Sequence, residues 1–388
     1  DVANMLTGAT PVANGGTALT SGFVNGKDPR PNTKPLIING DMMVAQRGTS
    51  ATGKTSGGYY TCDRMYANID SIGTYTIAQE SLSSGNAYNN GFREAWRIDT
   101  TTADASPAAT DNFSFNYIFE GQDLQLFKKG TSNAEKFTLA FWVKSNKTGT
   151  GNVNLFDTDN TRLIGGTYTI SSADTWEHKV VNFAADTTGA FTNDNNKSLV
   201  IEWWLDSGTN FSSGTTDTTW GAKDDTDRNA SGTLQIARDT ANDWAITGIQ
   251  LEVGEFSSTT LPPFQFEDFG ENLQRCLRYY YRANGRCGFG AGTGFVQDGA
   301  VKAYIYHTMP VAPRTEMSFS LSGTSSAIIT IDGNASDEVQ SISSIHADSS
   351  PFKDYEFNFV TNGSSVTDKC GMGIRINASN YIECSAEL

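Results

Sequence analysis

Short apolar runs with period-two alternation are the feature of this sequence that most constrains its fold. In FTLAFWVKS, residues 137–145, Phe, Leu, Phe and Val alternate with Thr, Ala, Trp and Lys. Such alternation places the two sets of side chains on opposite faces of a β-strand. The runs SLVIEWWLD, HKVVNFA and WAITGIQLEV are similar, and turn-forming residues separate them. We therefore expect residues 36–266 to form an all-β jelly-roll β-sandwich.

Similar runs continue to the end of the chain and predict a second, smaller β-sandwich over residues 295–388. They are GAVKAYIYHTM, TEMSFSLSG, SAIITIDG, YEFNFVTNG, GMGIRINAS and YIECSAEL. Between the sandwiches, Phe269, Leu273 and Leu277 recur at helical spacing, which predicts one junction helix over residues 267–282. A glycine-rich stretch follows, so we interpret residues 267–294 as a junction helix and hinge.

The first 35 residues are rich in Gly, Thr, Asn and Pro and poor in large apolar side chains. A segment of this composition cannot bury enough apolar surface to form a core of its own. We therefore interpret residues 1–35 as a linker or shaft segment that needs a partner surface to become ordered.

The charge balance excludes two classes of partner. The chain has 28 Lys+Arg against 43 Asp+Glu, a formal net charge of −15. A nucleic-acid groove needs clustered cations, and so does binding to an anionic membrane surface. No apolar run reaches the roughly 18 residues of a membrane-spanning helix, so we expect no membrane insertion.

The cysteines predict neither a zinc site nor a disulfide framework. There are five of them, an odd number with no metal-ligand spacing. We expect buried thiols, while pairing of Cys276 with Cys287 or of Cys370 with Cys384 stays open as an alternative. The five are Cys62, Cys276, Cys287, Cys370 and Cys384.

One stretch matches the phosphate-loop pattern G-x-x-x-x-G-K-[ST] letter for letter, from Gly48 to Thr55. A phosphate loop must lead into a helix whose N-terminus faces the phosphates. Here Ser-Gly-Gly-Tyr-Tyr follows, and two glycines disfavour a helix start. We expect a flexible loop between two strands and no nucleotide site.

Few residues could support catalysis, and we expect the chain not to be an enzyme. The three histidines are His178 and His307 in strand-like runs and His346 in an expected loop. Neither a nucleophile elbow nor a paired-histidine zinc helix accompanies them. Glu202, between Ile201 and Trp203, is the carboxylate to inspect for sugar hydrolysis, although an ordinary position on the solvent face is the default.

Two acidic segments, residues 157–160 (DTDN) and 224–227 (DDTD), resemble fragments of calcium loops. Neither has the glycine and distal glutamate of a complete calcium loop. We expect solvated acidic loops and no cofactor, and calcium stays open as the alternative.

Exposed tryptophans are the best candidates for contacting a sugar, because a flat aromatic face can stack on a sugar ring. Trp203 and Trp204 must point to opposite faces of their strand. Trp203 shares its face with apolar neighbours and is the core candidate, so Trp204 is the exposed one. Trp220 lies in a polar loop and is the second candidate ligand-binding residue.

Several segments, in order, resemble a carbohydrate-binding-module-like jelly-roll domain of bacteriophage tail-fibre and prophage fibre proteins. The segments are IINGDMMVAQRGTS…GGYYTCDR, EKFTLAFWVKS, DTWEHKVVNF and WAITGIQLEVGEFSSTTLPPFQFEDFGENLQRCLRYYYR, and they cover about residues 36–282. Within them Gln250, Leu251, Glu252 and Arg275 are interpreted as fold-defining. The stretch ANGGTALTSGF is similar to the glycine-rich stretches of fibre shafts.

The resemblance implies a structural virion protein, located in the tail fibre of an extracellular particle. Such fibres are commonly homotrimers, and a trimer would give residues 1–35 a partner surface. The implied partners are the chain itself, other tail or capsid proteins and a host cell-surface glycan, which the fibre binds during host attachment. Two alternatives remain: a capsid decoration or connector protein without a ligand, and a glycan-degrading enzyme of the tailspike type.

Overall fold

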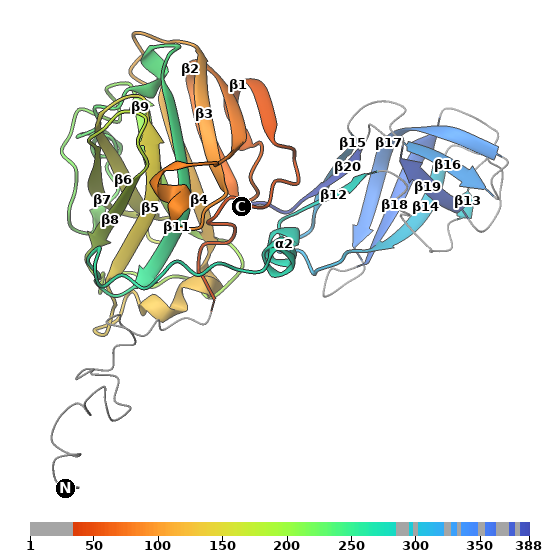
Figure 1. Cartoon of the computed structure of the whole chain (residues 1–388). Coiled ribbons are helices and arrows are strands. Elements are labelled where there is room, and N and C mark those ends of the chain that lie inside the picture. Colours follow the sequence, from red (N-terminus) through yellow and green to blue (C-terminus); the bar gives the residue numbers. More distant parts are fainter. Residues whose placement is uncertain are drawn as a thin grey trace, which may run out of the picture. The chain divides into compact units, whose positions relative to one another are not determined.

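The computed structural model of this protein describes residues 34–284, 295–297, 302–321, 327–331, 335–347, 354–361, 372–376 and 381–388. The chain divides into two compact units, Asp1–Glu267 and Asp268–Leu388, and each is described by itself (Figure 1). Most of the expected linker over residues 1–35 and the expected glycine-rich hinge after residue 284 lie outside the described residues. Both units consist mainly of antiparallel strands, which confirms the predicted all-β class.

The first unit is one antiparallel sheet that curls over on itself into a β-sandwich. Its strands are β1 (Ser50–Tyr59), β2 (Met65–Ser81), β3 (Glu94–Thr102), β4 (Asn112–Glu120), β5 (Phe137–Ser145), β6 (Gly149–Asp157), β7 (Arg162–Ile170), β8 (Glu177–Phe183), β9 (Lys197–Ser207), β10 (Gly221–Ala222) and β11 (Asp243–Val253). Along the sheet the order is β10-β7-β6-β9-β4-β2-β3-β11-β5-β8, and β1 pairs with β2 outside this path. Near the two ends of the path, β7 and β8 come close in space, so two halves of the sheet face each other.

Strand β2 belongs to both halves of this sandwich. Its first part, residues 65–70, pairs with β4, and its last part, residues 74–81, pairs with β3. β1 pairs with β2 over both parts. The halves are therefore joined along one side by a single long strand.

Short helices interrupt the connections of the first unit. They are α1 (Gly85–Asn89) and the 3-10 turns η3 (Gly121–Phe127), η4 (Asp225–Asp227) and η5 (Ile236–Arg238). The last two lie in the long connection from β9 to β11.

Aromatic side chains fill the space between the two halves. Trp203 of β9 has its ring centroid 5.3 Å from that of Phe115 in β4 and 5.6 Å from that of Phe141 in β5. Trp96 of β3 lies 4.6 Å from Phe115. All four are fully buried, and burying a large apolar side chain contributes roughly 1.5–3 kcal/mol.

A bulge in β11 keeps its apolar residues facing the core. Ile246 and Ile249 are both buried in the core, although residues three apart in a regular strand point to opposite faces. The ladder with β5 shifts between Thr247 and Gln250, and Gly248 within the shift has a φ of 62°. An extra residue of this kind reverses the phase of the strand, which leaves Gln250 on the outer face.

The second unit begins with helix α2 (Phe269–Leu277). Asp268 caps this helix, because its carboxylate accepts a hydrogen bond of 2.8 Å from the backbone N–H of Gly270. The predicted helix over residues 267–282 was too long. Residues Tyr280–Asn284 form strand β12 and pair with β20 (Tyr381–Ser385), as expected for a run of tyrosines that favours strands.

The strands of the second unit form two sheets. The remaining strands are β13 (Phe295–Gln297), β14 (Lys302–Thr308), β15 (Ser318–Leu321), β16 (Ala327–Ile331), β17 (Ala335–Ala347), β18 (Asp354–Thr361) and β19 (Met372–Ile376). One sheet has the order β12-β20-β15 and the other β13-β14-β18-β17-β16-β19. Each of the six predicted runs contains a strand, so the second, smaller β-unit is confirmed.

Two further expectations concern cysteines and membranes. Cys62, Cys276 and Cys384 are buried, whereas Cys287 and Cys370, the other members of the two pairs considered, lie outside the described residues. In the part of the chain that the structure describes, no helix has the length and apolar character needed to cross a membrane.

Candidate functional site

Trp203 and Trp204 point to opposite faces of β9, and both are buried. Trp203 is in the core, as predicted, but Trp204 is only 1% exposed, so the expectation that it is exposed was wrong. The connection after β9 folds back over this face of the sheet. It places the guanidinium of Arg228 4.8 Å from the centroid of the Trp204 ring and the ring of Phe211 at 5.2 Å.

Glu202 lies on the same face and is bound by the same arginine. Its carboxylate accepts hydrogen bonds from Nε and Nη2 of Arg228 and, at 3.2 Å, from Nε1 of Trp204. Burial alone would lower the pKa of Arg228, but Glu202 and Asp225 outweigh it and the pKa is raised. A buried carboxylate held by an arginine is a structural ion pair, so Glu202 does not support a hydrolytic site.

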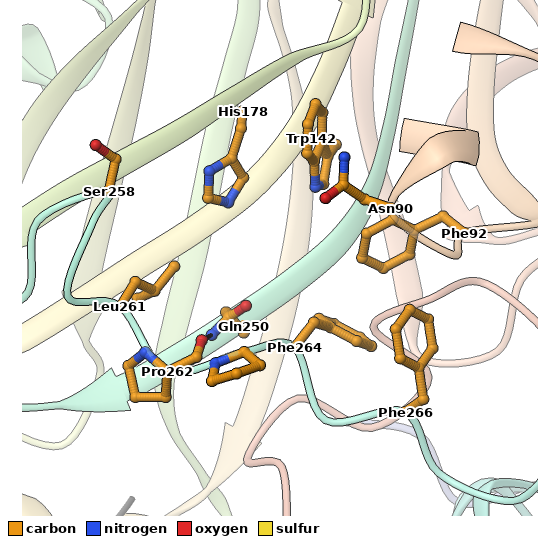
Figure 2. A pocket seen from close by; sticks show the side chains of 11 residues that line it. Asn90, Phe92, Trp142, His178, Gln250, Ser258, Leu261, Pro262, Phe264 and Phe266 are labelled. Carbon is orange, nitrogen blue, oxygen red and sulfur yellow. Dashed lines mark hydrogen bonds between the residues drawn. The ribbon is translucent and has the colours of Figure 1, made fainter. Parts of the chain in front are cut away.

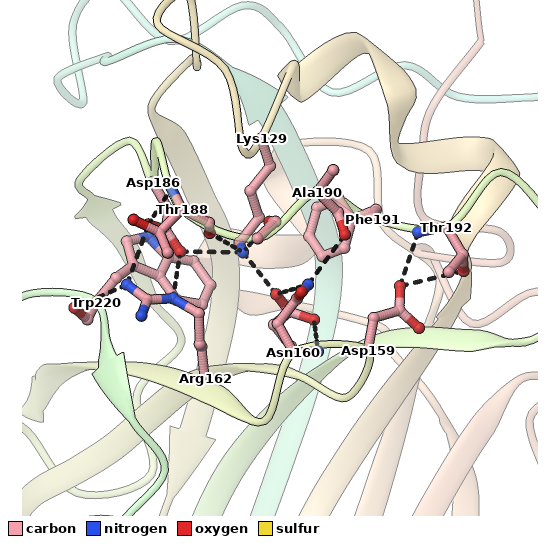
Figure 3. A network of polar contacts seen from close by, with 12 residues as sticks. Lys129, Asp159, Asn160, Arg162, Asp186, Thr188, Ala190, Phe191, Thr192 and Trp220 are labelled. Carbon is pink, nitrogen blue, oxygen red and sulfur yellow. Dashed lines mark hydrogen bonds and ion pairs between the residues drawn. The ribbon is translucent and has the colours of Figure 1, made fainter.

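Trp220 is a partly buried residue at the edge of the core. Its Nε1 donates a hydrogen bond of 2.8 Å to the carbonyl of Ala184. One side of the ring packs on Phe137, with centroids 6.0 Å apart, and the ammonium of Lys129 lies 5.0 Å from the ring centroid. Figure 3 shows this ring beside a polar network.

Lys129 is the centre of that network. Its side chain is 0% exposed, and its Nζ lies 2.5 Å from Oδ2 of Asp157 and 3.0 Å from Oδ2 of Asp186. The carbonyls of Thr188 and Gly189 accept from the same Nζ at 3.1 and 2.7 Å. An ammonium thus sits among four oxygen atoms in the interior of the first unit (Figure 3).

The carboxylates of the first acidic segment, residues 157–160, bind groups of the protein itself. Asp157 binds Lys129 and also accepts a hydrogen bond of 2.9 Å from Asn160, while Asp159 accepts from the backbone and hydroxyl of Thr192. The described residues contain no group of three or more His, Cys, Asp or Glu side chains placed for a metal. Calcium stays an alternative prediction from the sequence.

The second acidic segment, residues 224–227, is also engaged internally. Asp224 accepts from the backbone N–H of Thr226 at 2.9 Å. Asp225 pairs with Lys223 and Arg228, each at 2.8 Å.

The phosphate-loop pattern does not form a phosphate loop. Most of it, from Ser50 on, lies in β1, which runs to Tyr59 and pairs with β2. It is a strand rather than the expected loop, and no helix N-terminus follows it. The arrangement that would bind phosphate is therefore missing.

A pocket on the outer face of the first unit is lined by five aromatic rings. The cavity has a volume of about 330 Å³, at the small end of the range for ligand pockets, roughly 300–1,000 Å³. Its rings come from the segment after α1, from β5, from β8 and from the segment after β11. They are Phe92, Trp142, His178, Phe264 and Phe266 (Figure 2).

Trp142 and His178 form one wall of this aromatic pocket. They are directly opposite each other in the β5–β8 ladder, and their ring centroids are 5.0 Å apart with an interplanar angle of 35°. Burial, assisted by Lys179, lowers the pKa of His178, so the imidazole is neutral at pH 7. The two tilted rings lie next to each other and bring ring nitrogens to the pocket (Figure 2).

Three phenylalanines form an apolar wall, and one of them, Phe92, packs beside Trp142. Phe92 lies 4.9 Å from Phe264 and 5.1 Å from Phe266, and these two are 4.8 Å apart. Phe266 is 48% exposed, which is unusual for a large apolar side chain. The wall therefore offers apolar surface to the cavity.

Gln250 lies at the centre of the pocket (Figure 2). Its Nε2 donates to the carbonyl of Pro262 at 3.1 Å and to Glu252 at 3.2 Å. The bond to Pro262 holds the segment that carries Phe264 and Phe266 against β11. Gln250, interpreted as fold-defining from the sequence, thus also shapes the pocket.

The pocket was not predicted from the sequence. His178 was expected to be an ordinary strand histidine, and Trp142 was counted among packing residues. The sequence did indicate that Trp142 points outward. In the alternating pattern of its strand, Trp142 lies on the same face as Thr138 and Lys144, which is the outer face. The other two histidines lie in strands β14 and β17, and the expectation that His346 is in a loop was wrong.

Comparison with known proteins gives similarities of fold only. No protein-family model matches the sequence, and no curated protein matches it. The enzymatically active domain of tailspike protein 4 of bacteriophage CBA120 has 10% identity and a TM-score of 0.28 over 56% of this chain and 21% of that chain. The alignment therefore spans about a fifth of the tailspike chain.

Two other solved structures are matched over most of their own length. A putative sugar binding protein from Bacteroides thetaiotaomicron has 14% identity and a TM-score of 0.28, over 57% of this chain and 100% of that chain. The CBM22-2 xylan-binding domain of Paenibacillus barcinonensis Xyn10C has 13% identity and a TM-score of 0.26, over 48% and 91%. At these identities and TM-scores the similarity carries no argument about what this chain binds.

Proposed function

We propose that this chain is a virion appendage protein of a bacteriophage, a tail fibre that attaches the particle to its host by binding a cell-surface glycan. The resemblance of residues 36–282 to phage fibre proteins suggests the setting. The observation that carries the binding role is the aromatic pocket, which combines the rings of Trp142 and His178 with uncharged polar groups. Sugar rings present C–H groups to aromatic faces and hydroxyls to such polar groups.

The proposal includes a homotrimer in an extracellular particle. Three copies would bind a repetitive glycan together, so a weak site on each copy suffices for firm attachment. Trp204 and Trp220 remain candidate ligand residues of lower rank, because the first is buried and the second is held by Ala184 and Lys129. A native mass of three times 41.9 kDa is the expected result of light scattering.

The test is a titration of the full chain with purified host cell-surface polysaccharide. Removing an aromatic residue at the centre of a binding site costs about 2 kcal/mol, roughly thirtyfold in affinity, so we expect that loss for Trp142→Ala. The matched control is Tyr60→Ala, which removes a partly exposed ring whose hydroxyl donates to Ser56, and it should bind like the wild type. Equal affinity of Trp142→Ala and the wild type would overturn the role of the pocket.

The same titration addresses the two alternatives. New reducing ends released from the polysaccharide would favour a glycan-degrading enzyme. A protein that binds no host polysaccharide and does not compete with virions for host cells would favour a decoration or connector protein.

A further inference from the structure

We infer that the aromatic pocket selects an uncharged sugar that carries a methyl group, as in a 6-deoxyhexose or an N-acetylated amino sugar, over an acidic sugar. This inference rests on the proposed function and names the class of sugar that the pocket takes. Three properties of the pocket carry it: its charge, the chemistry of its two walls and the rigidity of its floor.

The pocket offers no charged partner to a ligand. None of its eleven lining residues is an acid, a lysine or an arginine. The nearest cation along β8, Lys179, is paired with Glu177 at 2.6 Å, and Lys144 on β5 is paired with Glu80 at 3.4 Å. A carboxylate entering this cavity would lose water and gain no counterion, which is unfavourable.

The two walls differ in chemistry, and the difference orients a ligand. On the Trp142–His178 wall, the indole nitrogen and the neutral imidazole can bond to hydroxyls, and Asn90 and Ser258 add uncharged polar groups nearby. The apolar wall, made by the phenylalanines with Leu261 and Pro262, adds no polar side chain to the lining. A ring with hydroxyls at one end and a methyl group at the other satisfies both walls at once.

The floor of the pocket is held in place before any ligand arrives. Gly248 has a φ of 62°, and a Cβ at this position would lie 2.5 Å from the Phe92 ring and 3.0 Å from Trp142. The two rings therefore rest directly on the backbone of the β11 bulge. The hydrogen bond from Gln250 to Pro262 fixes the third side. A preformed pocket loses little entropy on binding, so it can discriminate small differences in ligand shape.

The test compares matched sugars on the full chain, with saturation-transfer NMR or calorimetry as the readout. L-Rhamnose against L-mannose isolates the 6-deoxy methyl group, N-acetylglucosamine against glucose isolates the acetamido group, and glucuronate against glucose isolates the charge. Burying one methyl group is worth about a fourfold gain in affinity. We expect at least one methyl-bearing sugar to bind about fourfold or more tightly than its parent, and glucuronate to bind more weakly than glucose.

A variant pair connects the preference to the apolar wall. Phe264→Ser should reduce the ratio of affinities to about one, while Phe264→Leu, which keeps an apolar side chain, should retain it. Tryptophan fluorescence checks that both variants fold. A preference that persists in Phe264→Ser, or a preference for glucuronate, overturns the inference.

Its failure is distinguishable from failure of the proposed function. If the intact polysaccharide binds and Trp142→Ala weakens it, but parent sugars compete as well as methyl-bearing ones, only the inference fails. If the polysaccharide does not bind at all, the proposed function fails and the inference with it.

Discussion

Two adjacent lysines provide a sharp test of how the first unit is stabilised. Lys129 is fully buried between Asp157 and Asp186, whereas Lys128 is 52% exposed and pairs at the surface with Glu135 at 2.7 Å. Replacing each by Met removes one ammonium and keeps an unbranched side chain of similar length. The two variants therefore differ mainly in the burial of the ion pair that is lost.

The structure sets the expected magnitudes. Removing one partner of a buried ion pair costs about 3–5 kcal/mol, because the remaining charge is left uncompensated. Asp186 keeps its bonds to Arg162, at 2.8 and 3.1 Å, so the loss falls mainly on Asp157 and the lower end applies. We expect Lys129→Met to lose about 3 kcal/mol in free energy of unfolding, and Lys128→Met less than about 1 kcal/mol.

The assay is urea unfolding followed by tryptophan fluorescence. All seven tryptophans precede residue 268, so the signal reports the first unit alone. Equal losses in the two variants, or a loss below about 1 kcal/mol for Lys129→Met, would refute the assignment of the network as a major stabilising feature.

The pH dependence follows from Asp186. Burial alone would raise its pKa, but hydrogen bonds from Arg162, Lys129 and the backbone of Thr188 outweigh burial and hold the pKa below its usual value. A carboxylate with a lowered folded pKa stabilises the protein above its unfolded pKa of about 3.9, and this contribution is lost as the pH falls further. The difference between the wild type and Lys129→Met should therefore shrink below about pH 4.

Two more predictions use matched positions. Gly248→Ala should lower the free energy of unfolding by about 1 kcal/mol through backbone strain and by about 1–3 kcal/mol more through overpacking against the rings of Phe92 and Trp142. Gly53 also has a positive φ, 67°, but lies in open space, so Gly53→Ala should cost the strain alone. Equal losses of stability in thermal melts would contradict this. Burial raises the pKa of the thiols of Cys62 and Cys384. Both thiols should therefore resist a disulfide reagent at pH 8 in the native state and react once urea unfolds the chain. Rapid labelling of either thiol in the native protein would count against its buried position.

Much of the strand pattern was predictable, because alternation reports burial directly. The run FTLAFWVKS coincides with β5, and SLVIEWWLD lies within β9. The predicted helix was too long at its C-terminal end, where the run of tyrosines favours a strand and Tyr280 pairs with Ser385. Strand β17 was not predicted, since Asp337, Glu338 and several serines make its run polar.

The pocket and the buried polar face were harder to predict, because both depend on contacts between distant segments. Trp204 is covered by Arg228, which is 24 positions further along the chain and in a connection without periodicity. The aromatic pocket needs a strand bulge and the return of residues 261–266 to the outer face of β11. Apart from the outward phase of Trp142, neither the bulge nor this return leaves a local pattern in the sequence.

Strand β2, which belongs to both halves of the sandwich, and the Lys129 network lie in different parts of the sheet. β2 is in the middle of the strand path, whereas Asp157, Arg162 and Asp186 flank β6, β7 and β8 at its ends. Local opening of the sandwich should therefore begin between β7 and β8, where side chains rather than a shared strand hold the two halves together. Amide protons of β7 and β8 should exchange with deuterium before those of β2 and β4, so this edge of the first unit should open first on heating or under force.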